Sequence, residues 1–144
     1  TLSGAANDIT GISADAKEVV LSIHKASYNA TAELLIQLGT SGGIVATGYG
    51  GSGWATGGVN VVNSTGIRTQ NNAATDSANI VVFLKLLDPV NNIWAWTCHT
   101  ALDTAYAAWN TGTVTLPGVL DRVRLTTIPG TATADAGKMS LQYQ

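Results

Sequence analysis

The sequence has few of the residues on which most protein chemistry depends. Its 144 residues include one cysteine and two histidines, and only 11% are Asp, Glu, Lys or Arg. A single cysteine excludes an internal disulfide. Seven basic residues against nine acidic ones, with a formal net charge of −2, exclude electrostatic nucleic-acid binding as a main activity. No apolar run reaches the ~18 residues of a membrane span, so membrane insertion is not expected.

The composition instead favours one folded domain with a neutral surface. Hydrophobic residues make up 45% of the chain, which argues against disorder, and the length suits a single domain over residues 1–144. With so few charges, the surface must consist of Thr, Ser, Asn and Gly. Such surfaces are typical of extracellular β-proteins and of subunits that bury much of their area in an assembly. The chain begins at Thr1, so either its start has been processed or it is a piece of a longer polypeptide.

Alternating apolar and polar residues predict an all-β fold of eight to ten short strands. Residues 1–15 read as an irregular lead-in. Residues 18–26 and 32–38 are predicted to form one hairpin, and residues 79–87 and 93–100 a second one around Asp88-Pro89. Residues 112–144 contain three runs of alternating apolar and polar residues, separated by two Pro-Gly breaks. This pattern predicts a β-meander. The expected architecture is an antiparallel, jelly-roll-like β-sandwich.

No motif for catalysis, metal binding or a cofactor is present. The nine carboxylates show no recognised catalytic spacing, and no G-x-S-x-G nucleophile elbow occurs. Cys98 and His99 are neighbours on a predicted strand, so they point to opposite faces and cannot serve one metal together. The alternative for His24 or His99 is a metal on the threefold axis of a trimer, where symmetry triples the ligand. Asp121, beside Arg122 and Arg124, is expected to be a cross-strand ion-pair partner.

Four tryptophans stand out in a chain that is only 6% aromatic. Trp94 and Trp96 share one face of a strand and are expected in the core or a subunit interface. Trp54 lies in the glycine-rich stretch 50–58, predicted to be a loop. It is either an exposed platform for a sugar ring or an anchor buried against a neighbouring subunit. Tyr49 and Trp109 are the second-rank candidates for ligand binding.

Several short motifs in a fixed order resemble one family. They are Gln37-Leu38-Gly39 followed by Gly42-Gly43 and Thr47-Gly48-Tyr49, Trp94 after the Asn91-Asn92 turn, Leu120-Asp121-Arg122-Val123-Arg124 before Thr126-Thr127, and Asp135-Ala136-Gly137. This order resembles the C-terminal domain of tail-fibre-type structural proteins of tailed bacteriophages and prophages. The resemblance extends from about Ile9 to Tyr143. It departs at residues 101–110 and at the Trp54 loop. We predict residues 100–110 to be a long loop, with one or two helical turns as the alternative.

The resemblance implies a compact β-sandwich, usually homotrimeric, at the exposed end of a virion appendage. It implies no catalysis, and its partners would be the chain itself, other virion proteins and a host-surface glycan or protein. Two alternatives remain: a capsid decoration or cement protein, and a fragment of a tailspike glycan hydrolase.

Overall fold

The structure, a computed structural model, describes the backbone of all 144 residues and the side chains of residues 1–69 and 73–144. The described backbone forms two antiparallel sheets. No helix long and apolar enough to cross a membrane occurs among the described residues. The strands are β1 Asn7–Thr10, β2 Glu18–Tyr28, β3 Ala32–Thr40, β4 Gly43–Ile44, β5 Tyr49–Ala55, β6 Val59–Asn63, β7 Ile67–Asn72, β8 Ala78–Asp88, β9 Ile93–Leu102, β10 Ala107–Thr115, β11 Arg122–Ile128 and β12 Ala134–Tyr143.

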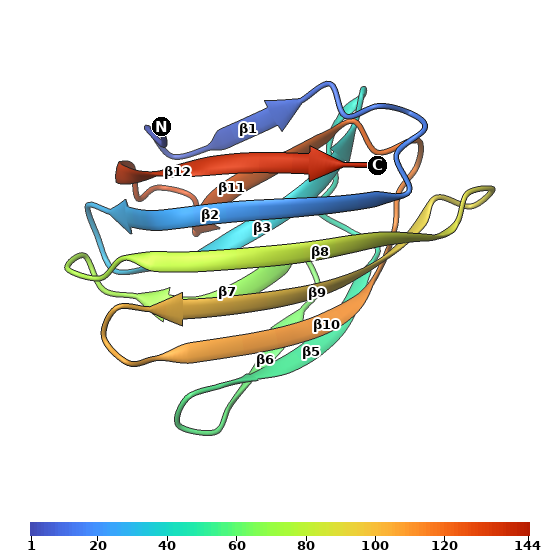
Figure 1. Ribbon diagram of the computed structural model, residues 1–144. Helices are drawn as coiled ribbons and strands as arrows, with labels where there is room; N and C mark the ends of the chain where they lie inside the picture. The colour runs from blue at the N-terminus through green and yellow to red at the C-terminus, as the bar shows by residue number, and fades with distance from the viewer.

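The two sheets pack face to face as a sandwich, which confirms the all-β prediction. The larger sheet has the order β12-β2-β8-β9-β10-β5-β6, and the smaller has the order β1-β11-β3-β4 with β7 also paired to β3 (Figure 1). Alternate residues of each sheet meet in one apolar core. The larger sheet contributes Leu21, Val82 and Trp96, and the smaller contributes Ile36 and Leu125, all at most 1% exposed. The opposite face of the larger sheet is left to solvent.

The predicted hairpin around Asp88-Pro89 is confirmed. Strands β8 and β9 pair over their whole length, with Ala78 opposite Leu102 at one end and Asp88 opposite Ile93 at the other. The Asp88 carboxylate accepts hydrogen bonds from the backbone N–H groups of Val90 and Asn91, at 2.8 and 3.1 Å. This local bonding is what an aspartate at the start of a turn provides.

The predicted hairpin of residues 18–26 and 32–38 is wrong. Strands β2 and β3 both exist, but β2 pairs with β8 and β12 while β3 lies in the other sheet. The connection between them does not close a tight turn. Instead Asn29 bonds to the segment before β12: its N–H donates to the Thr133 carbonyl and its Oδ1 accepts from the Thr133 N–H, each at 3.0 Å. Tyr28 is buried at the crossing.

The prediction of a C-terminal β-meander is also wrong, although its strands are present. Strands β10 and β12 belong to the larger sheet and β11 to the smaller, so the chain changes sheet at each Pro-Gly pair. Residues 116–121 separate β10 from β11, which is enough chain to cross the roughly 10 Å between packed sheets. Leu116 and Leu120 are buried along this crossing. Proline and glycine mark the breaks correctly but do not specify a hairpin.

The lead-in is ordered rather than irregular. Residues Asn7–Thr10 form β1 along the edge of the smaller sheet, antiparallel to β11. The Arg124 guanidinium on β11 donates to both carboxylate oxygens of Asp8, at 2.7 and 2.8 Å. This hydrogen-bonded pair lowers the pKa of the Asp8 carboxyl below its ordinary value. Leu2 and Ile12, on either side of the strand, are buried in the core. Asp121 pairs with the adjacent Arg122, at 2.8 Å, and not across strands as expected.

Candidate binding surface

Trp54 and Trp109 lie directly opposite each other on the solvent face of the larger sheet. The expectation that Trp54 occupies a loop is wrong, because Tyr49–Ala55 forms β5, which pairs antiparallel with β10. In that register Trp54 faces Trp109. Their exposed fractions are 55% and 50%, so each indole keeps one large apolar surface in water. Two of the three sequence candidates are therefore brought together.

The row of aligned residues continues across the sheet. Trp109 lies opposite His99 on β9, and the Phe83 ring on β8 meets the His99 ring edge-on with centroids 6.5 Å apart. A shallow hollow of about 390 Å³ lies between Trp54, Trp109 and His99, with Thr56, Thr100 and alanines completing its lining. We refer to Trp54, Trp109, His99 and Phe83 as the aromatic row. It is a flat, ring-lined surface, in contrast to an enclosed catalytic pocket.

The inner face explains why the row is flat and why β5 is rich in glycine. A Cβ on Gly53 would lie 2.0 Å from the Trp109 carbonyl oxygen, and one on Gly112 would lie 2.5 Å from the Trp96 indole. The Trp96 ring occupies the space that the missing side chains of Gly51 and Gly112 leave. Its Nε1 donates to the Asn110 Oδ1 at 3.2 Å, and the Asn110 Nδ2 donates to the Arg68 carbonyl at 2.8 Å. Trp109 thus has a rigid and fully hydrogen-bonded support beneath it.

A tight connection between β9 and β10 sets the position of Trp109. The prediction of a long loop over residues 100–110 is wrong, because β9 continues to Leu102 and β10 begins at Ala107. The Leu102 N–H donates to the Tyr106 carbonyl at 2.8 Å, and Ala105 adopts a left-handed φ of 66°. An alanine in this conformation gives no sequence signal, since glycine or asparagine is usual there. The turn places Trp109 opposite His99.

Tyr49 is not part of the surface. Only 8% of it is exposed, its ring packs against Trp96 with centroids 5.8 Å apart, and its hydroxyl oxygen accepts a hydrogen bond from the Leu38 N–H at 2.7 Å. Burial raises the pKa of the Tyr49 phenol to about 12 despite that hydrogen bond. Tyr49 is therefore a core residue that joins the two sheets, and its place among the ligand-binding candidates is corrected.

Trp94 and Trp96 are buried in the core, with exposed fractions of 2% and 1%. The core was one of the two locations expected for them. Cys98 is fully buried beside them, and burial raises the pKa of its thiol to about 12, which leaves it protonated at neutral pH. His99, its neighbour, points to the opposite face. The side chains described in the structure contain no group of three or more His, Cys, Asp or Glu that could hold a metal ion.

The aromatic row lies on an uncharged part of the sheet. Among the described residues, the outward positions of β5, β6, β9 and β10 carry no Asp, Glu, Lys or Arg. The outward groups beside the rings include the hydroxyls and amide of Ser52, Asn60 and Thr111, together with the exposed Val62 opposite Ser52. The surface can therefore stack against a flat apolar group and offer hydrogen bonds around it, without supplying a charge.

Sequence reasoning missed Phe83. Because the stretch 79–87 is so apolar, the sequence predicts a central strand there. This prediction gives no reason to single out the residues of the strand that face outward. The signal was available in the alternation: Val82 and Leu84 are buried, so Phe83 must face outward, and it is 50% exposed. His99 was considered for a metal but not as a neighbour of Trp109.

Comparison with known protein families finds no family model that matches this chain, and a search of curated proteins finds no match either.

Proposed function

We propose that this chain is a virion structural domain of the bacteriophage tail-fibre type that adheres to a host-surface glycan. The observation that carries the proposal is the exposed Trp54–Trp109 pair, held on the open face of a rigid sheet. Indole faces suit the C–H-rich face of a sugar ring, and tryptophan is among the residues that dominate binding energy at interfaces. The motif order supports the fibre assignment. The absence of a preformed catalytic constellation among the described side chains is compatible with adhesion.

The local surroundings of the pair favour a small polar ligand over a protein interface. Protein interfaces bury aromatic anchors inside a broad apolar centre. Here the tryptophans are flanked along their own strands by Ser52 and Thr111, with Asn60 opposite Trp54. A sugar presents hydroxyls at its rim and C–H groups on its face, and the pattern of this surface is complementary to that. The capsid decoration alternative would require these polar groups to be covered by a protein partner.

The proposed assembly is a homotrimer with jelly-roll-like connectivity. The chain crosses repeatedly between the sheets, at β2 to β3, at β10 to β11 and at β11 to β12, which is compatible with such connectivity. A trimer would present three copies of the aromatic row, and three weak sites engaged together gain avidity. The virion would be its location, with other virion proteins as its neighbours.

Replacing both tryptophans, as W54A/W109A, is expected to remove glycan adhesion. A tryptophan at the centre of a binding site typically contributes 2 kcal/mol or more, so each single variant should bind at least about thirtyfold more weakly. The measurement is binding to an array of bacterial surface polysaccharides. Tyr106→Ala is the matched control, because Tyr106 is an equally exposed aromatic (46%) in the β9–β10 turn, outside the row. If wild type and double variant bind the array equally, the surface is not an adhesion site.

The solution mass of the isolated chain tests the assembly. Light scattering on a size-exclusion column should give three times the 14.8 kDa of one chain. The double variant W54A/W109A should keep that mass, because the proposal places the tryptophans outside the subunit interface. A drop to monomer in that variant alone would assign the pair to the interface instead. Release of cleaved product from a bound glycan would favour the tailspike hydrolase.

A further inference from the structure

The open face of the larger sheet does not end at the aromatic row. A second hollow of about 260 Å³ lies beside it, lined by Val20, Phe83, Ala95 and Thr97 among others. Phe83 borders this hollow, and its ring meets the ring of His99, which lines the hollow at the tryptophans, so the two hollows are neighbours. A third hollow, of about 270 Å³, follows at the edge of the sheet and again includes Val20.

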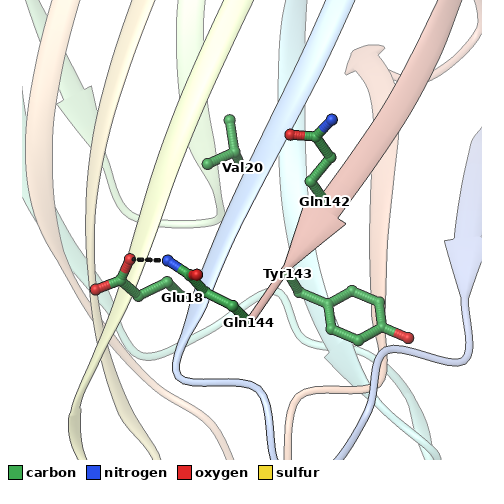
Figure 2. Close-up of a pocket in the computed structure, with 5 residues that line it drawn as sticks. All are labelled: Glu18, Val20, Gln142, Tyr143 and Gln144. Carbon is green, nitrogen blue, oxygen red and sulfur yellow. Dashed lines mark hydrogen bonds between the residues drawn. The ribbon is translucent and has the colours of Figure 1, made fainter.

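The third hollow is the polar end of this open face. Figure 2 shows Val20 of β2 and Gln142 of β12 projecting to the same side of the sheet, with the Gln144 amide donating to the Glu18 carboxylate at 3.0 Å. Tyr143 projects away from them. Val20 and Gln142 are direct partners in the β2–β12 register. Along the face, therefore, the aromatic rings are followed by a hollow lined by Val20, Ala95, Thr97 and the paired Glu18 and Lys85, and then by side-chain amides.

We propose that this face binds a neutral oligosaccharide of several residues, which stacks on Trp54 and Trp109 and extends over Phe83 and Val20 towards Gln142. This inference rests on the proposed adhesion function and specifies its ligand. It extends the aromatic row, which ends at Phe83 on β8, by a binding segment on β2 and β12, and it excludes acidic glycans as the main ligand.

The dimensions of the face require more than one sugar residue. From Trp54 on β5 to Val20 on β2 the path crosses β10, β9 and β8, which is four interstrand spacings or about 19 Å. A single ring would cover only the hollow at the tryptophans. Both further hollows are open and shallow, and they share Val20, so a chain can lie across them without entering a closed pocket.

The charges on the face exclude an acidic ligand. Glu18 and Lys85 are opposite in register and form an ion pair with each other, so this lysine is already neutralised. The hydrogen bond from Lys85 lowers the pKa of the Glu18 carboxyl, which therefore stays anionic at neutral pH. Lys138 lies opposite His24, two aligned pairs beyond the Ser22–Ser140 pair and away from Gln142. Along this path an acidic glycan would meet the Glu18 carboxylate and no unpaired lysine or arginine among the described residues. The net charge of −2 adds repulsion.

Length and charge of the ligand are the two variables of the test. Chitotetraose, cellotetraose and maltotetraose are titrated against the intact chain by calorimetry, with the matching disaccharides and with oligogalacturonate as the acidic probe. At least one neutral tetrasaccharide should bind tenfold or more tightly than its disaccharide and than the acidic probe. Its affinity should change less than twofold between 50 and 300 mM salt.

Two variants locate the extension. Phe83→Ala and Gln142→Ala are each expected to lower tetrasaccharide affinity about fivefold, so that the ratio of tetrasaccharide to disaccharide affinity falls toward one. Tyr106→Ala should keep the wild-type ratio. Equal affinity for the two lengths, preference for the acidic probe, or no binding of any neutral probe would each overturn the inference. The adhesion function would still stand in those cases if the polysaccharide array showed binding that W54A/W109A removes.

Discussion

Replacing Trp96 with alanine is expected to bring the protein close to unfolding. Truncating a fully buried tryptophan typically costs about 3–5 kcal/mol, against a total stability of about 5–15 kcal/mol for a domain. Trp96 is 1% exposed, packs on Tyr49, and fills the space left by Gly51 and Gly112. No neighbouring side chain can move into that space, because the facing positions are glycines. The measurement is urea unfolding followed by circular dichroism.

A pair of phenylalanine variants separates the apolar packing of Trp96 from its hydrogen bond. Trp96→Phe keeps most of the ring but leaves the Asn110 Oδ1 without the indole donor, which should cost a further 1–3 kcal/mol or so. In Trp94→Phe the lost indole N–H has no hydrogen-bond partner among the described atoms, so no acceptor is orphaned. We therefore expect the Trp96 variant to be the less stable of the two. Equal loss in both would contradict a structural role for the Trp96–Asn110 bond.

The sequence predicts which residues form strands better than which strands are neighbours. Alternation in residues 18–26 correctly places Val19, Leu21 and Ile23 on one face of the strand, and that face is buried. It gives the buried face of each strand, but both sheets bury a face in the same core, so the pattern cannot assign a strand to a sheet. The β8–β9 hairpin was predictable because Asp88-Pro89 defines a short turn between two long runs. The Asn29 connection was not, since its partner Thr133 lies 104 residues away.

The candidate site was predictable in its residues but not in its geometry. An exposed Trp54 was one of the two alternatives predicted, whereas its pairing with Trp109 depends on a strand whose glycines were interpreted as a loop. The alternation of side chains along a strand would have corrected the interpretation of Tyr49 as a ligand-binding residue. In an extended strand, residues 49 and 54 must face opposite sides of the sheet. Since Trp54 is exposed, Tyr49 has to be buried, as it is. Recognising the strand was therefore the step that determined the site.

Replacing Gly53 of β5 is the second change that we expect to have a large effect on stability. Gly53 does not adopt a left-handed backbone, so the reason for glycine here is space. A Cβ at this position would lie 2.0 Å from the Trp109 carbonyl oxygen and 2.3 Å from the Asn110 Cβ. The first of these is backbone and cannot rotate away. Gly53→Ala is therefore expected to force β5 away from β10, at a cost of about 1–3 kcal/mol or more, in the range of overpacked cores.

Gly50 is the matched control, because it lies on the same strand and has nothing within 4 Å of its Cβ position. Gly50→Ala should be neutral or stabilising by up to about 1 kcal/mol, since alanine restricts the unfolded chain. The two variants add the same methyl group, so a difference in urea midpoint reports only on the space beneath β10. Gly53→Ala should also weaken glycan binding, because it shifts Trp54 relative to Trp109, whereas Gly50→Ala should not. Equal midpoints would show that β5 and β10 can separate at no cost, and the rigid support proposed for the aromatic row would then be wrong.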